Sequence, residues 1–524
     1  MSQATDPFRQ ALELHQSGEL RAAEGRYRQA ITLQPQSAAA HRHLGLVLAD
    51  LGRHAEAAEC QRQTIALDPQ SAAAHQALGT ALWWVGRLAE AEACFRRVLE
   101  LEPENVAAMH GLGGVLLGQH LFAEAEDWYR RVVQAAPDHA DSQLRLGQCL
   151  HFNGKFDEAI ERFRRAIVLG ASPPECDSWI AQSHLLSGDL AAAGDDIERA
   201  LELSPQDANA RVFRATLMLT RGDMPHGWHE FEHRTRLPEA AARPVRAPLW
   251  DGAPLDNWTL LVESERGLGD TLQFVRYLPL LAGRCRRVLF EARPSLVDLL
   301  RESGIENVIA EGDPLPPIDA RIPLMSLPAR LETTLSTIPA EVPYLRTSAV
   351  RVAQWRQRLS VVEGLKVGIH WQGNPTFVGD RHRSIPLSHF GALVDMPGVQ
   401  LVSLQKDPAG GTPDSFEGRL LVFDDLDREG GAFLDTAAII ENLDLVITSD
   451  SAVAHLAGAL AAPVWLVLST ACDWRWLVDR SDSPWYPTMR IFRQITLGDW
   501  PEVFARLAAE LAEVVASSCP PSRA

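Results

Sequence analysis

Proline recurs at intervals of 34 residues through the first part of the chain. The members of this series are Pro35, Pro69, Pro103, Pro137 and Pro205, while Ala171 fills the one missing place and Pro173 stands two residues beyond it. An alanine lies twelve residues before each place, and a larger side chain lies eight residues before it. These residues are Ala23, Ala57, Ala91, Ala125, Ala159 and Ala193, and Tyr27, Gln61, Phe95, Tyr129, Phe163 and Ile197. Self-similarity at this period predicts a stack of paired helices in which each unit packs mainly against its neighbours.

The repeat unit resembles the tetratricopeptide repeat, in which small residues let paired helices approach and proline ends the second helix. Glycines at the small position of the first helix strengthen the resemblance, and they are Gly45, Gly79, Gly113 and Gly147. Six units and a degenerate seventh predict a helical superhelix over residues 1–236. The resemblance implies a protein or peptide bound in its groove; the alternative is an array that only spaces or dimerises the rest. Trp83 and Trp84 are a candidate groove contact, or at least one of them is core.

The pattern changes after a Pro/Ala-rich linker over residues 237–257, in which Trp250 either contacts one neighbouring domain or packs in the ordinary way. Short apolar runs then alternate with helical segments, which is typical of doubly wound α/β folds. The predicted strands are 258–264, 287–292, 307–312, 320–327, 366–371, 399–405, 419–425, 444–450 and 463–469. The predicted helices are 270–282, 294–304, 348–359, 433–443, 451–460 and 501–518. Two successive series predict an N-terminal lobe over 258–360 and a C-terminal lobe over 361–524.

Composition narrows the class of protein. The 524 residues carry 50 Lys plus Arg against 68 Asp plus Glu, a formal charge of −18 that disfavours nucleic acid as a partner. The seven cysteines are scattered without metal-ligand spacing, which indicates a reducing compartment and no structural metal. No apolar run is long enough for a transmembrane helix, and the N-terminus lacks the apolar core of a signal peptide. We therefore expect a cytoplasmic protein.

Residues 444–469 read as a strand, a tight polar turn, a short helix and a second buried strand. Ser449, Asp450 and Ser451 stand at the helix start, and His455 follows one helical turn later. A helix N-terminus after a parallel strand presents unpaired N–H groups where phosphate binds well. The same residues also suit an ordinary buried unit in which Asp450 caps the helix and His455 lies in the core.

A second strand–turn–helix junction carries Gly267, Gly269 and Asp270 after the first strand of the N-terminal lobe. The glycines permit close backbone approach, and Asp270 stands where the predicted helix begins. An aspartate there stabilises a helix by about 1 kcal/mol over alanine, so capping and a catalytic role are compatible interpretations.

Taken together, three motifs resemble the family 9 glycosyltransferases, the lipopolysaccharide heptosyltransferases of GT-B fold. The motifs are GLGD at 267–270, an arginine pair at Arg381 and Arg383 after GIHWQGNP, and S-D-S-A-x-A-H at 449–455. The resemblance runs from about residue 258 to the C-terminus, and RSIPL, DWRWL and DSPWYPTMR are similar as well. It implies a repeat superhelix followed by an α/β GT-B fold, whose two Rossmann-like doubly wound lobes face a cleft.

The resemblance implies a role for each matched residue. Asp270 corresponds to the general base that deprotonates an acceptor hydroxyl, in one inverting displacement. Arg383, or alternatively Arg381, would neutralise charge on the departing diphosphate, although Arg383 also suits a surface loop. The donor-binding motif is matched by Ser449, Asp450, Ser451, Ala452 and His455.

Two further groups have open roles. Gln405 and Lys406 end a strand of the C-terminal lobe, where they either contact the nucleotide or belong to a solvated loop. A set of aromatic residues either forms a wall beside the cleft or packs the closing helix over 501–518, and its members are Trp474, Trp476, Trp485 and Tyr486.

The expected function is therefore transfer of a hexose or heptose from a nucleotide-diphosphate sugar to a glycan or protein hydroxyl, without a cofactor or metal. The family usually has glycine where this chain has Ala452, and commonly lysine where it has arginine, so the sugar stays unnamed. The alternative is a non-catalytic repeat scaffold with a degenerate glycosyltransferase domain.

Overall fold

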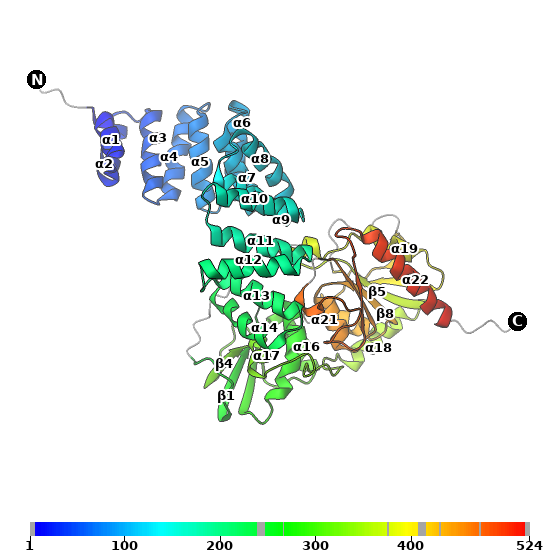
Figure 1. Cartoon of the computed structure of the whole chain (residues 1–524). Helices are drawn as coiled ribbons and strands as arrows, with labels where there is room; N and C mark the ends of the chain where they lie inside the picture. Colours follow the sequence, from blue (N-terminus) through cyan, green and yellow to red (C-terminus); the bar gives the residue numbers. More distant parts are fainter. Residues whose placement is uncertain are drawn as a thin grey trace, which may run out of the picture. The chain divides into compact units, whose positions relative to one another are not determined.

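A computed structural model describes residues 6–237, 247–265, 267–374, 377–406, 416–428, 431–470 and 473–518. The chain divides into two compact units, Met1–Ser183 and His184–Ala524 (Figure 1). The sequence boundary at residue 236 follows the repeat pattern, whereas this division follows packing. The last helices of the array therefore fall in the second unit.

The array consists of paired antiparallel helices joined by short turns. In the first unit these are α1 (Pro7–Gln16), α2 (Leu20–Leu33), α3 (Ala38–Asp50), α4 (His54–Leu67), α5 (Ala72–Trp84), α6 (Leu88–Leu101), α7 (Val106–Gly118), α8 (Phe122–Ala135), α9 (Ala140–Phe152) and α10 (Phe156–Val168). Helix α11 (Pro173–Ser187) carries the boundary, and α12 (Leu190–Leu203), α13 (Ala208–Thr220) and α14 (Met224–Phe231) belong to the second unit. Six pairs and a shorter seventh agree with the predicted repeat number.

The repeat residues pack as the sequence pattern predicts. The six alanines and six larger side chains of the pattern are all buried. Each glycine faces the larger side chain of its own repeat: a Cβ on Gly147 would lie 2.6 Å from Phe163, and one on Gly113 would lie 2.9 Å from Tyr129. Glycine in the first helix thus makes room for the aromatic ring of the second.

Trp83 and Trp84 end helix α5, and neither is core. Their exposed fractions are 42% and 64%, and Trp84 stacks on His54 with ring centroids 5.4 Å apart. The prediction that at least one of them is core is wrong, because both follow the last apolar contact of the helix and lie beside solvent.

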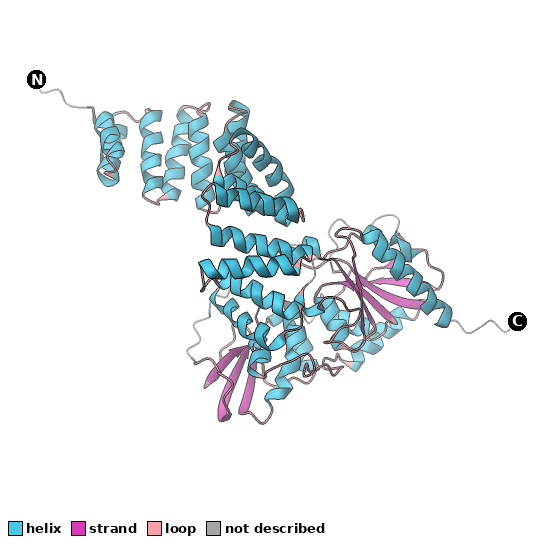
Figure 2. Cartoon of the chain, in the orientation of Figure 1, coloured by secondary structure: helices cyan, strands magenta, loops and turns pink. Residues whose placement is uncertain are grey.

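The second unit contains two parallel sheets, coloured magenta in Figure 2. The first has the order β3-β2-β1-β4 and the second has the order β7-β6-β5-β8-β9-β10. Their strands are β1 (Leu255–Glu263), β2 (Cys285–Ala292), β3 (Val308–Ala310), β4 (Ala320–Pro323), β5 (Leu365–His370), β6 (Val399–Ser403), β7 (Leu420–Leu421), β8 (Leu445–Ser449), β9 (Val464–Leu468) and β10 (Met489–Arg493). The second order is the doubly wound order 3-2-1-4-5-6 when its strands are counted along the chain.

Helices cover both faces of the six-stranded sheet. The helices of this lobe and the one leading into it are α18 (Ala349–Leu359), α19 (Gly391–Val394), α20 (Leu434–Ile440), α21 (Ala452–Ala459) and α22 (Trp500–Ser518). The helices that follow strands of the four-stranded sheet are α15 (Leu268–Phe274), α16 (Val297–Glu302) and α17 (Leu327–Arg330). Alternate residues of β8 and β9 enter two different cores: Ile447 packs with α22, whereas Val446 packs with α20 and α21. Burial on both faces explains why these strands read as continuous apolar runs. No helix within the described ranges is long and apolar enough to cross a membrane.

Three details of the predicted elements are corrected. The helix expected over 270–282 begins earlier, as α15, and continues as a 3₁₀ helix, η3 (Val275–Leu281), because Pro279 cannot supply a helical N–H. Strand β10 is absent from the predicted strands; its first two residues end the DSPWYPTMR stretch. Strand β7 is only two residues long, and it pairs with the outer side of β6.

The last helical repeat packs directly on the first lobe. Trp228 of α14 is buried against Phe274 and Trp474, and Arg234 of η1 (Glu232–Arg236) donates to Glu265 at 2.6 Å and Ser326 at 2.9 Å. Part of the predicted linker, residues 238–246, lies outside the described residues. Its end is attached to the lobe: the Trp250 indole donates to the Ala253 carbonyl at 2.7 Å, and Trp250 N–H donates to the carbonyl of Arg321 in β4.

Candidate functional site

The strand order places the switch point of the second lobe between β5 and β8. In open α/β sheets, ligands bind outside the carboxyl ends of the strands at such a point. Strand β5 ends at His370 and β8 ends at Ser449, so the serine-rich turn predicted from sequence follows directly from this edge. The turn therefore occupies the position that the fold reserves for a ligand.

The turn residues are buried and partly committed to one another. The Ser451 hydroxyl lies 3.0 Å from His370 Nδ1 and 3.3 Å from the Thr448 hydroxyl. Ser451 is the N-cap residue of α21, but its side chain accepts no bond from that helix. The Ser449 hydroxyl is buried and has no hydrogen-bond partner within the described ranges.

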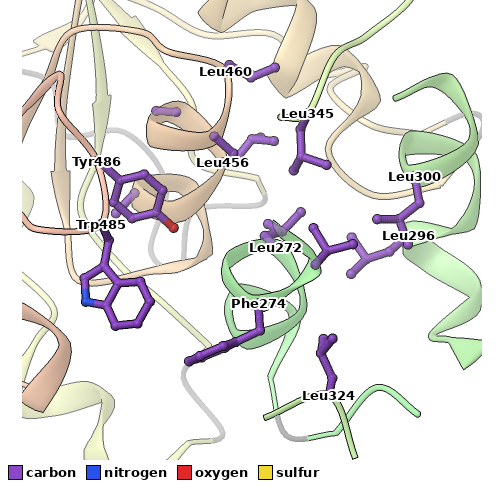
Figure 3. Close-up of a cluster of buried hydrophobic side chains, with 14 of the residues drawn as sticks. Leu272, Phe274, Leu296, Leu300, Leu324, Leu345, Leu456, Leu460, Trp485 and Tyr486 are labelled. Atoms are coloured by element: carbon purple, nitrogen blue, oxygen red, sulfur yellow. The ribbon is translucent and has the colours of Figure 1, made fainter. Parts of the chain in front are cut away.

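Helix α15 of the first lobe meets α21 of the second at their N-termini. A Cβ on Gly269 would lie 3.0 Å from His455 Cδ2 and 3.4 Å from Ala452 Cα. Beneath this contact the two lobes share one apolar core, in which Leu272 of α15 and Leu456 of α21 both take part (Figure 3). The two junctions singled out in the sequence therefore lie against each other.

Asp270 lies in the first turn of α15 as residue N3, with Gly267 as the N-cap. Its Oδ2 accepts the Gly267 N–H at 2.7 Å, and its Oδ1 pairs with the guanidinium of Arg475. The expected position at the start of the helix is thus shifted by one turn, because the glycines themselves form the cap. Asp270 therefore takes part in the cap from N3 and is not the N-cap residue, and its carboxylate stays partly exposed, at 19% of its side chain.

Asp450 is buried in the turn between β8 and α21. Burial raises its pKa to about 6, and the carboxylate of Asp473 acts in the same direction, while Arg383 and Arg475 oppose the shift. Asp450 is therefore a carboxyl group that changes charge close to neutral pH, with two arginines within electrostatic range.

Two buried histidines stand beside this group. His455 Nδ1 lies 2.9 Å from the Tyr486 hydroxyl, and the imidazole ring stacks on Trp476. Burial, together with Arg475, Arg276 and Arg383, holds the pKa of His455 well below its usual value. Burial and Arg383 lower the pKa of His370 to about 3. Both rings are consequently neutral at pH 7, and the cations of the site are arginines.

Arg383 follows the short helix η6 (Val378–His382). Its Nε donates to Asp380 Oδ1 at 3.2 Å, and the guanidinium lies 4.8 Å from the centroid of the Phe377 ring. A Cβ on Gly373 would lie 2.8 Å from one of its terminal nitrogens, so that glycine provides the space the guanidinium occupies. Arg383 acts on the pKa values of Asp450, His455 and His370, and it therefore belongs to the same cluster. Arg381 lies on the exposed side of η6.

Gln405 and Lys406 lie after β6, on the side of β5 away from β8. Gln405 accepts the Gln372 N–H at 3.1 Å, and the Lys406 ammonium donates to the carbonyl of Asp427 at 3.1 Å. These contacts tie both residues to neighbouring loops, so nothing in them supports a nucleotide contact over a loop-stabilising role.

The four aromatic residues Trp474, Trp476, Trp485 and Tyr486 do not pack the closing helix. Trp474 and Trp485 are buried against Phe274 and Trp228, and Trp476 covers His455. Tyr486 lies 3.5 Å from the Tyr344 hydroxyl and beside the buried guanidinium of Arg276. Their large rings form the seam between the two lobes and α14, and the Trp485 indole N–H donates to the Arg475 carbonyl at 3.0 Å.

Sequence reasoning missed three members of the cluster: His370, Asp473 and Arg475. His370 ends a predicted strand, and the other two lie in the DWRWL motif, which was noted only as a similarity. For His370 and Asp473 the available signal was the position after a parallel strand, whereas no local signal pointed to Arg475. Within the described part of the chain, no group of three or more His, Cys, Asp or Glu side chains is arranged to hold a metal ion.

Comparisons with known proteins bear mainly on the repeat. Models of the tetratricopeptide repeat match residues 8–72, 77–140 and 116–175. Protein FlbA of Caulobacter vibrioides is 26% identical over 359 residues, which is 63% of this chain and 60% of that protein. The chain thus spans about three fifths of the length of this curated relative, and the alignment is longer than the repeat stretch that the models match.

Solved structures also resemble the chain. Pseudomonas aeruginosa PilF is 20% identical, with a TM-score of 0.36, over 40% of this chain and 95% of its own. YrrB, described as a tetratricopeptide protein with an unusual peptide-binding site, is 19% identical, with a TM-score of 0.33, over 35% and 95%. The repeat models establish that the N-terminal region is a tetratricopeptide repeat array, a fold with the capacity to bind protein partners.

Proposed function

We propose that the protein is a glycosyltransferase of GT-B type, which moves a sugar from a nucleotide-diphosphate sugar to a hydroxyl acceptor. The donor binds at the switch point of the second lobe. Asp270 of the first lobe takes the proton of the acceptor hydroxyl as the glycosidic bond forms and the bond to the diphosphate breaks. One such displacement inverts the configuration at the anomeric carbon.

One observation carries the proposal: the glycine-rich turn after β1 and the serine-rich turn after β8 touch each other, at Gly269 and Ala452. Each turn lies at the carboxyl end of a parallel strand, where α/β folds bind ligands. A carboxylate from one lobe and a helix N-terminus from the other consequently share one site, as a transfer between two bound substrates requires.

The charges suit a diphosphate leaving group that is held without a metal. Arg383 is half-buried beside the turn, and an arginine presents a fork of donors that matches phosphate oxygens. The N–H groups at the start of α21 and the unpartnered Ser449 hydroxyl are further donors at the same edge. Neutral His370 and His455 add hydrogen-bonding capacity without adding charge.

The acceptor is a glycan or a protein segment, and the repeat array binds that protein or another partner. The exposed aromatic pair Trp83 and Trp84 is the candidate contact on the array. Aromatic residues that are exposed in the free protein commonly anchor such interfaces.

Donor binding is tested by thermal unfolding of the full chain with nucleotide-sugars and free nucleoside diphosphates. A ligand at 100 times its dissociation constant stabilises the native state by about 2.7 kcal/mol. We expect stabilisation by one nucleotide class and its loss in Arg383→Gln. The matched control is Arg358→Gln, which removes an exposed pair with Asp425. If neither ligand type stabilises the protein, there is no donor site.

Catalysis is tested with Asp270→Asn, which keeps the size of the side chain and removes the base. Transfer should fall by about 10²–10⁴, the range for loss of a general base, while stabilisation by the donor persists. Asp298→Asn on the exposed side of α16 is the control. Equal transfer by the Asp270 variant and the unsubstituted protein excludes the proposed base.

A second candidate is a repeat scaffold whose transferase lobes are inactive. This alternative is favoured by the contacts of Asp270: both oxygens of its carboxylate already bind protein groups, as expected of a residue with a structural role. Under this alternative Asp270→Asn weakens the lobe interface, and the unsubstituted protein transfers no sugar to any acceptor. The two candidates therefore differ in the activity of the unsubstituted protein.

A further inference from the structure

The tripeptide Trp474–Trp476 forms a single 3₁₀ turn, η9, and sends its three side chains to three different elements. The indole of Trp474 packs edge-on against Trp228 of α14, with ring centroids 5.2 Å apart. Trp476 stacks on His455 of α21 at 5.3 Å. Arg475, between them, points to α15. The turn thus contacts the last repeat helix, α14, together with α15 of the first lobe and α21 of the second.

Arg475 is almost fully enclosed, with 8% of its side chain exposed. Its Nε donates to Gln273 Oε1 at 2.6 Å, one terminal nitrogen donates to Asp473 Oδ1 at 2.8 Å, and the other pairs with Asp270 Oδ1. Burial acts to lower the pKa of Arg475, but the carboxylates of Asp473 and Asp270 carry it above its usual range. The guanidinium stays charged, and two of these three bonds, to Gln273 and Asp270, reach the first lobe.

This arrangement fixes the carboxylate of Asp270 from two sides. Arg475 binds Oδ1, and the Gly267 N–H binds Oδ2. Each carboxylate oxygen offers two lone pairs, so each retains one for an incoming hydroxyl. Because Arg475 also bonds to Gln273 one turn further along α15, it sets both the rotation of that helix and the direction of the carboxylate. Asp270 and Arg475 are separated by 205 residues, and the bond therefore joins the lobe of the proposed base to the lobe of the proposed donor site.

We propose that Arg475 is a positioning residue for the transfer: it holds Asp270 toward the donor turn and acts on the reaction only through that carboxylate. This inference rests on the proposed function. Misplacement of a reacting group by about 1 Å costs on the order of 10²-fold in rate. The alternative is a purely structural role, in which Arg475 stabilises the interface between the two lobes to the same extent whether or not Asp270 is present.

The test is a double-mutant cycle on the rate of transfer. The variants are Asp270→Asn, Arg475→Gln and the two combined, with Arg475→Lys as a conservative substitution that retains the charge. Arg480→Gln is the matched control, since Arg480 follows in the same loop and pairs with the exposed Asp482. Both kcat and the KM for donor are measured on the full chain, and thermal unfolding confirms that each variant is folded.

We expect Arg475→Gln to lower kcat by about 10–100-fold with little change in the KM for donor, since the side chain of Arg475 bonds to Gln273, Asp473 and Asp270. Arg475→Lys should recover part of that loss. The combined variant should be no slower than Asp270→Asn alone, because a residue that acts through Asp270 has no effect once the base is absent. If Arg475→Gln fails to fold, the comparison of Arg475→Lys with and without Asp270→Asn gives the same result.

Two outcomes overturn the inference. Losses that multiply in the combined variant show that Arg475 acts independently of Asp270, and they leave the proposed function intact. Absence of both transfer and donor binding in the unsubstituted protein overturns the proposed function itself, and with it any role of Arg475 in transfer. The two failures are therefore distinguished by the unsubstituted protein alone.

Discussion

Gly269 and His455 touch across the two lobes, although they are 186 positions apart in the chain. A Cβ on residue 269 would lie 3.0 Å from Cδ2 of the imidazole, closer than nearly all Cβ contacts in proteins. The ring itself cannot retreat, because Trp476 stacks on its face and the Tyr486 hydroxyl binds Nδ1. The absence of a side chain at 269 thus allows the two helix N-termini to meet.

Gly269→Ala should therefore destabilise the second unit. The added methyl group would meet His455 Cδ2 at 3.0 Å, so the held imidazole must give way, while backbone atoms of Ala452 at 3.4–3.7 Å already fill the neighbouring space. Overpacking of this kind costs about 1–3 kcal/mol in the free energy of unfolding. The control is Gly391→Ala in α19, where nothing lies within 4 Å of the new atom. Chemical unfolding measures both variants, and equal stability of the two contradicts the close contact.

In the repeat array, the fit between Gly147 and Phe163 makes a separate prediction. Alanine ordinarily favours a helix over glycine by about 1 kcal/mol, but here its Cβ would meet the Phe163 ring at 2.6 Å. We expect Gly147→Ala to lower the free energy of unfolding by about 1–3 kcal/mol. Gly25→Ala in α2 has open space around it and should instead be stabilising.

Combining Gly147→Ala with Phe163→Leu tests the cause. Phe163→Leu alone leaves a cavity. When residue 147 is alanine, the smaller leucine side chain at 163 makes room for the added methyl group and relieves the clash. The cost of the combined change should therefore be less than the summed costs of the single changes. Additive losses contradict a direct contact between the two residues.

The repeat array was predictable almost residue by residue, because its contacts are local and recur every 34 residues. Ala91 and Phe95 belong to one helix, and Gly79 lies on the helix before it, so the sequence interval itself encodes the contact. Strands β5, β8 and β9 were predictable for a different reason: burial on both faces leaves an apolar run between polar turns.

The site was only partly predictable. The sequence indicates that Asp270 and Ser449–Ser451 follow parallel strands, and this property places each at a carboxyl edge. It carries no information on Arg475, whose partner Asp270 is 205 residues away and whose neighbours in sequence are tryptophans. Long-range pairing in a seam between lobes depends on the packing of both lobes, which no local pattern records.

His370 should make the stability of the second unit sensitive to acid. Its pKa is about 3 in the folded chain, against 6.5 for an unperturbed histidine, since burial and Arg383 disfavour the cation. The unfolded state binds the proton first, so stability is fully present above pH 6.5 and is lost as the pH falls toward 3. The slope from this group is about 1.4 kcal/mol per pH unit.

Comparison with His370→Asn isolates this contribution. The variant keeps a hydrogen-bonding side chain near Ser451 and does not titrate in this range. The difference in unfolding free energy between parent and variant should be constant above pH 7. Between pH 6.5 and 4 the parent should lose stability relative to the variant. A difference that is independent of pH means that the histidine titrates normally in the folded chain.

Asp450 should make the stability of the second unit depend on pH in the opposite direction. Burial and Asp473 raise its pKa to about 6, whereas an unfolded aspartate titrates near 3.8. The folded state therefore holds the proton more strongly, and the cost of the buried anion appears as the pH rises from about 4 to 6 and stays constant above that. Across this window the free energy of unfolding of Asp450→Asn should rise relative to that of the parent by up to about 3 kcal/mol. Unfolding curves at pH 4.5 and 7.5 provide the measurement.

The same group predicts how donor binding depends on pH. A nucleotide-diphosphate sugar keeps its two negative charges between pH 5 and 8, so only the protein changes charge beside it. Asp450 repels the diphosphate when ionised and does not when protonated; we therefore expect the dissociation constant to fall as the pH is lowered from 7.5 to 5.5. In Asp450→Asn the dissociation constant should be low and nearly constant over this range. Isothermal titration calorimetry measures both, and an equal pH dependence in the two proteins would place the diphosphate away from Asp450.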